Sequence, residues 1–302
     1  MNIFIGLTDY NWFITLRSKN IDEVNFWRPG STAFHALMPN DLFMFKLKKP
    51  YYAIVGGGFF VSYSSVPIDL AWKAFGEKNG TKDYQEFRDR IAAYREKNRI
   101  DAALPHIGCI ILTQPFFFPE SQWITQPNDW PTSAVVGKKY DTAFGEGKRI
   151  YQQVVDRLSC QPAIQEADAV RYAEGMAKHR LGQGAFRILV TDAYHRRCAV
   201  SGEKTLPVLQ AAHIKPCAMD GTHDVTNGIL LRSDLHTLFD DGYLTITKDL
   251  ILEVSHRLHE DYGNGKDYYK YHGSKLLITP DNMLQSPSPE LLAWHNENVY
   301  LG

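Results

Sequence analysis

Residues 209–246 read LQAAHIKPCAMDGTHDVTNGILLRSDLHTLFDDGYLTI, and this stretch decides the fold of the C-terminal part of the chain. A short apolar run ends at His213, Asn227 precedes a second apolar run, and His236 lies inside SDLHTLFD. Ser233 is a typical helix N-cap residue, so we expect His236 in the first turn or so of a short helix. A strand, a loop, a strand and a helix in this order would bring His213 and His236 face to face, because the helix packs back onto the hairpin.

The segment resembles the ββα-metal fold of HNH nucleases, in which AHIxP, an NG pair before LL, and a helical LHxLFD recur in this order. Asn227 follows His213 by fourteen residues and His236 follows Asn227 by nine, and both separations match the family. The preceding GQGAFR…Y…CAVSG resembles the lead-in of a bacterial HNH branch found in restriction-type enzymes. The resemblance implies a metal-dependent DNA endonuclease.

The resemblance also implies a role for each of the three motif residues. His213 would be the general base that activates water, a task that suits an imidazole because its ordinary pKa lies near working pH. His236 would be a metal ligand on the helix. Asn227 would hold the loop so that His213 is correctly oriented. We therefore expect His213, Asn227 and His236 to form the catalytic set.

One position departs from the family pattern and leaves the metal without a ligand. Most members have Asp or His immediately before the base, whereas this chain has Ala212. Asp240 is our candidate replacement, because it follows His236 by one helical turn and both side chains can reach the same ion. Weaker alternatives are Asp241, His223 and Asp224. An oxygen ligand favours Mg²⁺ or Mn²⁺.

The cysteines predict neither a disulfide framework nor a structural zinc. Cys109, Cys160, Cys198 and Cys217 form no CxxC pair, whereas many HNH domains hold a structural zinc with two such pairs. We expect Cys198 and Cys217 to be small buried apolar residues. Widely spaced cysteines, with no secretory signal and no long apolar run, favour a cytoplasmic protein without a membrane span.

The overall charge does not favour an indiscriminate nucleic-acid binder. The formal net charge is −1, whereas such proteins usually carry a strong basic excess. Positive charge that contacts DNA phosphate must therefore be local. Our candidates for this contact, next to the predicted nuclease site, are Arg196, Arg197 and Lys215.

The first half of the chain predicts a mixed α/β domain. Runs of β-branched and aromatic residues predict strands over 42–47, 52–63 and 108–118. Helical spacing predicts helices over 70–80 and 82–99, and Pro, Gly and Asp predict loops over 119–147. The helical patterns 148–158 and 169–181 indicate a connector. We expect an α+β protein with three parts: a domain over 1–150, a helical linker over 151–182 and an HNH nuclease domain over 183–302.

The N-terminal part also resembles a known family. STAFHALMPNDLFMFKLKKPYYAIVGGGFFVSY and GCIILTQPFFFPESQWI are similar to PUA-like β-barrels, most nearly the EVE branch. The resemblance implies a barrel with helices, and related barrels hold a flipped, modified base in an aromatic cage. An extruded base must be stacked on aromatic faces and hydrogen-bonded at its polar edge. Our candidates for this pocket are Asp9, Asn11, Trp12, Trp27 and Phe59, and for any single aromatic the core is the competing interpretation.

Together these features predict a modification-dependent restriction endonuclease. Its N-terminal domain would read 5-methylcytosine or 5-hydroxymethylcytosine in double-stranded DNA by base flipping, and its HNH site would cut. Because one HNH site cuts one strand, double-strand cleavage implies two chains acting together, so a homodimer is one expectation. Three alternatives stay open: a nuclease that reads an unmodified sequence, a nucleic-acid-binding module that no longer cuts, and an N-terminal domain that reads RNA.

Overall fold

The structure is a computed structural model that describes residues 1–131, 136–159 and 181–302. It divides into two compact units, Met1–Gly182 and Gln183–Gly302, and each is described by itself. None of the helices in the described ranges combines the length and hydrophobicity that a membrane span needs.

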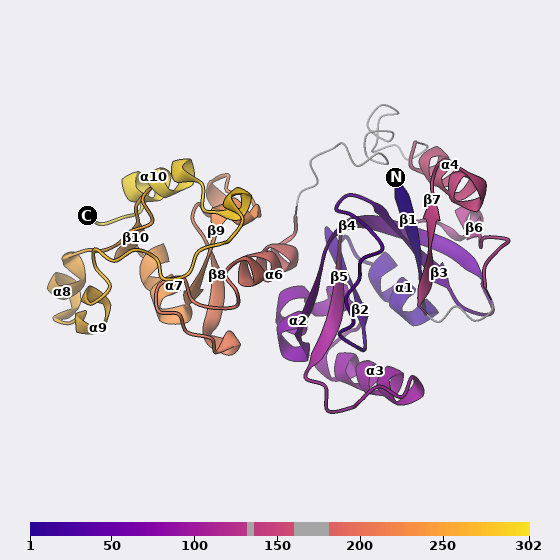
Figure 1. The fold of residues 1–302 in the computed structure, drawn as a ribbon, viewed down its shortest axis with the longest axis horizontal. Coiled ribbons are helices and arrows are strands. Elements are labelled where there is room, and N and C mark those ends of the chain that lie inside the picture. The colour runs from indigo at the N-terminus through magenta and orange to yellow at the C-terminus, as the bar shows by residue number, and fades with distance from the viewer. Residues whose placement is uncertain (132–135, 160–180) are drawn as a thin grey trace. The chain divides into compact units, whose positions relative to one another are not determined.

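The N-terminal unit is built on one sheet, whose described strands follow the order β2-β5-β4-β3-β1-β7, with β6 paired to β4 (Figure 1). β1 and β3 are parallel and the other pairs are antiparallel. The strands are β1 (Asn2–Thr8), β2 (Glu23–Arg28), β3 (Leu42–Leu47), β4 (Ala53–Pro67), β5 (His106–Phe117), β6 (Ile124–Thr125) and β7 (Gly137–Asp141). The helices are α1 (Tyr10–Arg17), α2 (Ile68–Phe75), α3 (Tyr84–Lys97) and α4 (Gly145–Ser159).

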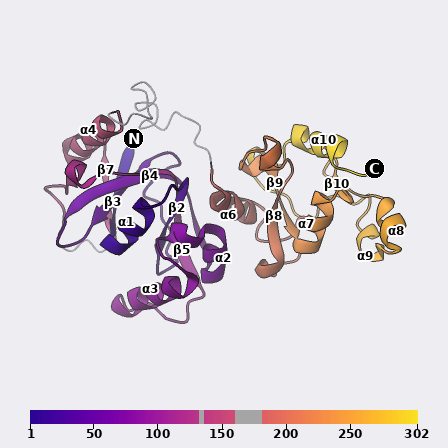
Figure 2. The ribbon, with the colours of Figure 1, turned by 180° about the vertical axis from the view of Figure 1, so that it is seen from behind.

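Alternation along the strands gives this sheet two apolar faces. Phe43 and Phe45 of β3 pack with Phe13 of α1, whereas Leu42 and Met44 of the same strand pack with the cluster that includes α4. Helices therefore cover both faces, as Figure 2 shows from behind. Each face of the sheet thus contributes to a buried apolar cluster, as a layered fold requires.

The predicted α+β class is confirmed, but the predicted barrel is not closed. In the described residues β2 pairs only with β5 and β7 pairs only with β1, so both remain edge strands. The short 3-10 helix Gly76–Asn79 packs beside β2, where a closed barrel would have another strand. Asn25 Nδ2 donates to Asn79 Oδ1 at 2.8 Å, and Trp27 Nε1 donates to the Asn79 carbonyl at 3.0 Å.

Two segments differ from the sequence expectation. Residues 137–141, expected within a loop, form β7 because they pair antiparallel with β1. The pattern 148–158, expected to begin the linker, lies in α4, whose Ile150, Val154 and Leu158 are buried in the sheet's core. The second linker helix, over 169–181, lies outside the described residues except for Leu181.

The C-terminal unit is a hairpin and a helix wrapped by smaller elements. Its elements are α6 (Gln183–Ala193), β8 (Leu209–His213), β9 (Gly228–Arg232), α7 (Ser233–Asp240), β10 (Leu244–Ile246), β11 (Leu252–Val254), α8 (Arg257–Tyr262), α9 (Lys266–Tyr269) and α10 (Pro289–Asn298). β8 pairs antiparallel with β9, and β10 with β11. Phe186, Leu230, Leu235, Phe239 and Leu292 share one buried core, which fixes α6, α7 and α10 around the hairpin.

Candidate functional site

The C-terminal unit contains a cavity of about 950 Å³ that joins the two motif histidines. His213 is the last residue of β8 and His236 lies in α7, and both line this cavity together with His223 and Asp240. Helix α7 begins at Ser233, but its N-cap is Arg232 and no side chain caps it. The hairpin and the helix therefore place the two histidines on the walls of one space.

Asn227 fixes the loop that separates β8 from β9. Its side chain is fully buried and accepts from the Lys215 amide at 2.9 Å, while its Nδ2 donates to the carbonyls of Lys215 and Thr222 at 2.9 and 2.8 Å. The Asn227 carbonyl also accepts from the Ile214 amide at 2.9 Å. One side chain thus ties both ends of the loop directly after His213.

His213 is held as a neutral imidazole. Burial, together with the nearby His223 and His236 imidazoles, lowers the pKa of His213 to about 4 against the opposing effect of the Asp240 carboxylate. Its ring stacks on Phe186 with centroids 4.0 Å apart, and its Nε2 lies 3.0 Å from His223 Nδ1. A neutral ring keeps one nitrogen lone pair that can take up a proton from water, but a pKa of about 4 makes His213 a weaker base than an imidazole of ordinary pKa.

His236 and Asp240 offer a pair of ligand atoms of the kind that a divalent cation needs. His236 Nδ1 lies 2.6 Å from Gln210 Oε1, an acceptor that suits a proton on Nδ1, and His236 Nε2 lies 3.2 Å from Asp240 Oδ2. In an octahedron with ligands at about 2.1 Å, adjacent ligand atoms lie about 3 Å apart. The spacing of these two atoms fits neighbouring ligands of one divalent cation.

The arrangement places the His213 imidazole and the His236–Asp240 pair on the walls of one cavity. This combination can activate water and neutralise charge on a phosphate. A model of the HNH endonuclease family matches residues 198–247.

These residues form an HNH endonuclease domain. The HNH domain contains His213, Asn227, His236 and Asp240, and the predicted enzyme class, a metal-dependent DNA nuclease, is confirmed. A comparison with curated proteins finds no match to the chain.

Comparison with solved structures finds weak likenesses. One is to a mutant of the ASCH protein of Zymomonas mobilis, with 10% identity and a TM-score of 0.33 over 50% of this chain and 96% of that one. Another is to the modification-dependent TagI restriction endonuclease, with 13% identity and a TM-score of 0.29 over 97% of this chain and 81% of that one. Both similarities are too low to establish a shared fold.

The predicted phosphate contacts are not part of the cavity wall. Arg196 Nε donates to Asp192 at 3.1 Å, Arg197 Nε donates to the Gly202 carbonyl at 3.4 Å, and Lys215 Nζ lies over the Trp294 ring at 5.3 Å. Among the described residues, the Lys or Arg side chain that lines this cavity is Arg187 of α6, which sequence reasoning missed. The sequence places Arg187 one helical turn after Gln183, but only the structure shows that both face the cavity.

Cys217 also differs from the expectation. Cys198 is buried as predicted, but Cys217 is exposed and lines the cavity, so its assignment as a buried apolar residue is wrong. A short 3-10 turn at Cys217–Met219 places it there. This turn lies in the loop whose residues Lys215 and Thr222 are bonded to Asn227, contacts that the local sequence does not reveal.

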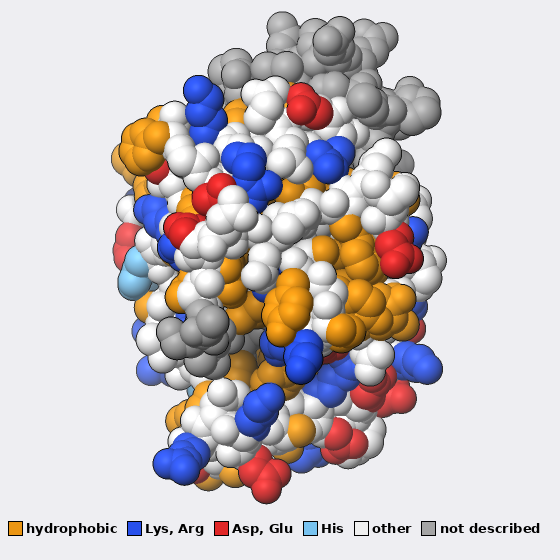
Figure 3. Space-filling model, turned by 90° about the vertical axis from the view of Figure 1, so that its right-hand side faces the viewer, with side chains coloured by type: hydrophobic (Ala, Val, Ile, Leu, Met, Phe, Trp, Pro, Cys, Tyr) orange, Lys and Arg blue, Asp and Glu red, His pale blue; other side chains and the backbone are white. Residues whose placement is uncertain are grey.

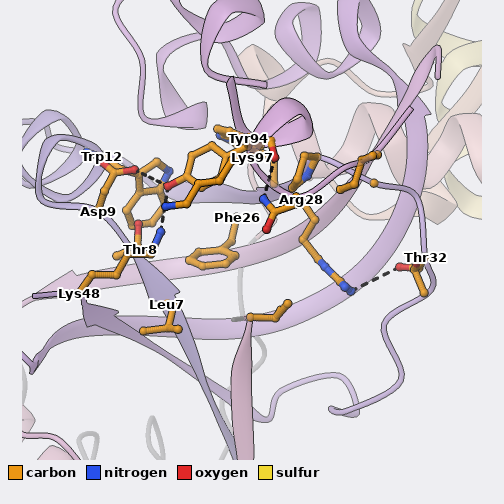
Figure 4. Close-up of a pocket in the computed structure, with 16 residues that line it drawn as sticks. Leu7, Thr8, Asp9, Trp12, Phe26, Arg28, Thr32, Lys48, Tyr94 and Lys97 are labelled. Carbon is orange, nitrogen blue, oxygen red and sulfur yellow. Dashed lines mark hydrogen bonds between the residues drawn. The ribbon is translucent and has the colours of Figure 1, made fainter. Parts of the chain in front are cut away.

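The N-terminal unit has a separate cavity of about 470 Å³ (Figure 4). Asp9, Trp12 and Trp27 of the predicted base pocket line it, together with Phe26 and Tyr94. Trp12 is mostly buried and packs edge-on against Phe26, whereas Trp27 is half-buried. Aromatic groups from β2, α1 and α3 therefore converge on one space.

A polar network lies at one end of this N-terminal cavity. Lys48 Nζ donates to Tyr94 Oη at 3.0 Å, and Tyr94 Oη donates to Asp9 Oδ2 at 3.1 Å. Asp9 Oδ1 also accepts from the Trp12 amide at 2.8 Å and so caps α1. Burial and the Asp9 carboxylate raise the pKa of Tyr94 to about 12, so its hydroxyl remains a hydrogen-bond donor.

Two residues predicted for the base pocket do not line the N-terminal cavity. Phe59 is wholly buried in the core on the α4 side of the sheet, so its assignment to the pocket is wrong. Asn11 is exposed on α1 and does not line the cavity. The adjacent Asp9 and Trp12 do, because helical geometry turns neighbouring side chains in different directions.

Proposed function

We propose that the chain is a modification-dependent DNA endonuclease that reads 5-methylcytosine or 5-hydroxymethylcytosine with its N-terminal unit and cuts with its HNH domain. The observation that carries the proposal is that one chain combines the HNH site with a second cavity that has aromatic walls and a hydrogen-bonding end. The sequence resemblance of the first unit to PUA-like domains supports the same reading.

The N-terminal cavity has the chemistry that a flipped base requires. Phe26 and Trp27 supply aromatic surface, and Leu7 and Ile100 supply apolar wall for a methyl group. The network through Tyr94 supplies donors and acceptors for the polar edge of the base. Extrusion costs a few kcal/mol, which stacking and hydrogen bonds in such a cavity would offset.

In the HNH domain each residue has a distinct task. His213 accepts the proton of the attacking water, and Asn227 holds the loop that orients His213. His236 and Asp240 would hold the divalent cation, which would supply positive charge to the phosphate and the leaving oxygen. Arg187 lies in the same wall and is placed to contact phosphate.

The surface charge suits an enzyme that depends on recognition. On the face seen in Figure 3, Lys and Arg side chains are interspersed with Asp, Glu and hydrophobic groups and form no continuous basic surface. The net charge of −1 limits non-specific affinity for phosphate. Cleavage would then depend on occupation of the N-terminal cavity, which would spare unmodified DNA.

The test is cleavage of one duplex sequence carrying cytosine, 5-methylcytosine or 5-hydroxymethylcytosine, in Mg²⁺ and in Mn²⁺. We expect cleavage of a modified duplex and little of the unmodified one, with no cleavage by His213→Ala. Equal cleavage of all three would refute the reader but retain the nuclease. Absence of nicking under every condition would refute the nuclease and favour a module that binds without cutting.

One HNH site cuts one strand at a time. We propose that two chains act together on one modified duplex. Mixing wild-type chain with excess His213→Ala should then convert double-strand breaks to nicks. If a single chain cuts both strands, the number of double-strand breaks would depend only on the amount of wild-type chain present.

A further inference from the structure

His213, Cys217 and His223 form a cluster that the proposed reaction does not use as a whole. One ligand atom from each lies within 4.8 Å of the other two. His213 Nε2 is 3.0 Å from His223 Nδ1, and Cys217 Sγ is 3.8 Å and 3.7 Å from these two nitrogens. Two imidazoles and a thiol thus point at one position in the cavity wall.

These separations are close to the edges of a tetrahedral metal site. With zinc bonded to nitrogen at about 2.05 Å and to sulfur at about 2.3 Å, ligand atoms lie about 3.4 Å (N···N) and 3.6 Å (N···S) apart. Each of the three observed distances is within about 0.4 Å of these values, so small side-chain movements suffice. Nitrogen and sulfur donors select a soft or borderline cation, unlike the nitrogen and oxygen pair of His236 and Asp240.

The fold holds the three groups together without a metal. His213 is fixed by its β8 pairing with Gly228 and by stacking on Phe186. Cys217 and His223 both lie in the loop that Asn227 ties at both ends. A preorganised cluster loses little conformational entropy when a cation binds, which raises affinity.

We propose that His213, Cys217 and His223 bind Zn²⁺ as a three-residue site with a fourth position open to water, and that Zn²⁺ here switches the nuclease off. On binding, the Cys217 thiol loses its proton to solvent and the thiolate forms the bond to zinc. The inhibitory half of this proposal rests on the proposed function, whereas the binding half does not.

Inhibition follows from the single lone pair of a neutral imidazole. When a metal takes the lone pair on Nε2 of His213, the proton of the ring lies on Nδ1, and neither nitrogen can accept a proton from water. The base is lost whichever nitrogen faces the water. Mg²⁺ does not cause this loss, because it prefers oxygen ligands and binds thiolate poorly.

The binding test uses Co²⁺ as a coloured substitute for Zn²⁺ on the full chain in excess Mg²⁺. We expect a thiolate-to-cobalt charge-transfer band that Zn²⁺ removes by displacement. The band should be absent in Cys217→Ser and weakened in His223→Gln, and unchanged in His256→Gln, which alters an exposed histidine of the same unit. A band of equal strength in Cys217→Ser would overturn the site.

The activity test compares Zn²⁺ inhibition of DNA nicking at fixed excess Mg²⁺. Cys217 is not part of the proposed reaction, so Cys217→Ser should nick at the wild-type rate without zinc and should need about tenfold more Zn²⁺ for half-inhibition. Equal inhibition of both proteins would overturn the switch while leaving the nuclease intact. If wild-type protein does not nick DNA at all, the proposed function fails, and the cobalt spectra still decide the metal site.

Discussion

Asn227 shows how a single buried amide supports the proposed chemistry. It makes three side-chain hydrogen bonds, all to the backbone of the loop that follows His213. Removing a partner from such a network leaves buried polar groups unpaired, which costs more than the hydrogen bonds themselves contribute. We therefore propose that Asn227 positions His213 and does not touch the substrate.

Asn227→Ala should lower the free energy of unfolding by about 3 kcal/mol, because Lys215 and Thr222 lose their partners. Nicking should fall sharply even at temperatures where the variant remains folded. Urea unfolding and a nicking assay measure the two effects. Asn128→Ala, at an exposed asparagine of the other unit, should match wild type in both. Full activity of folded Asn227→Ala would show that the loop does not depend on this amide.

His295 is the second residue whose environment fixes its protonation. It is 2% exposed, its Nε2 donates to the Phe239 carbonyl at 3.1 Å, and its Nδ1 lies 2.9 Å from Thr245 Oγ1. Burial lowers its pKa to about 4 from 6.5, against the opposing effects of the Phe239 carbonyl and Asp240. The folded state therefore holds His295 neutral.

This shift predicts that acid destabilises the C-terminal unit. Between pH 6.5 and 4 the unfolded chain binds a proton at His295 that the folded chain does not, so stability falls as pH falls. From pH 7.5 to 4.5 the loss due to His295 is about 2.5 kcal/mol. His295→Gln should be less stable than wild type at pH 7.5. At pH 4.5 the difference between the two free energies of unfolding, measured with urea, should be smaller by that amount. His256→Gln should stay parallel to wild type, and a constant gap for His295→Gln would contradict the assignment.

At the scale of elements, helix α7 brings the proposed metal ligands together. His236 and Asp240 are one turn apart on the helix, and with the His236 ring also in contact with Gln210 of β8 its Nε2 lies 3.2 Å from Asp240 Oδ2. Asp241 also lines the cavity but lies at the helix C-cap. The two adjacent carboxylates therefore provide a matched pair for a test.

Asp240→Asn should weaken activation by Mg²⁺ or Mn²⁺ by about tenfold or more, because the amide lacks the negative charge of the carboxylate. Asp241→Asn should change it by less than about twofold. Both the metal dependence of nicking and direct Mn²⁺ binding should show the difference. A larger effect in Asp241→Asn would transfer the ligand role to that residue.

The sequence predicts elements where the pattern is local and fails where tertiary contacts decide. The predicted strand 42–47 is β3 with the same bounds. All of its residues are buried, so the run can be recognised as a strand without the alternation of apolar and polar residues that a half-exposed strand shows. β7 was not predicted, since GKKYD carries no strand pattern and becomes a strand only by pairing with β1. Helix α4 was predicted, but its packing on the sheet was not.

The same distinction applies to the sites. The positions of His213, Asn227 and His236 could be expected from spacing, because a hairpin and a helix are local. The N-terminal cavity could not, because which face of a strand a residue occupies depends on its register. Phe60 packs in the core beside α1 whereas Phe59 packs on the opposite face, and the sequence FF gives no means of distinguishing them.

At the scale of the whole molecule, the chain has two compact units with separate cores and separate cavities. The proposed recognition and the proposed cleavage each depend on residues of one unit. Substitutions should therefore separate the two activities.

His213→Ala should bind modified DNA as tightly as wild type and fail to cut it. Tyr94→Phe should impair recognition and retain cleavage. The preference for modified over unmodified DNA should fall about tenfold, because the hydroxyl between Lys48 and Asp9 is lost. Slow nicking of DNA should persist. Binding by fluorescence anisotropy and cleavage of the same duplexes measure both. Tyr84→Phe, on the same helix outside the cavity, is the matched control. Unchanged preference in Tyr94→Phe would remove this network from recognition.

Asp9 constrains how such an enzyme can evolve a new target. The same carboxylate caps α1 and holds the Tyr94 hydroxyl, so replacing it would cost about 1 kcal/mol of helix stability in addition to any effect on the cavity. Lys48 and Tyr94 have no capping role. Homologues that acquire a different base preference should therefore vary at these two positions and retain an acidic or amide side chain at position 9.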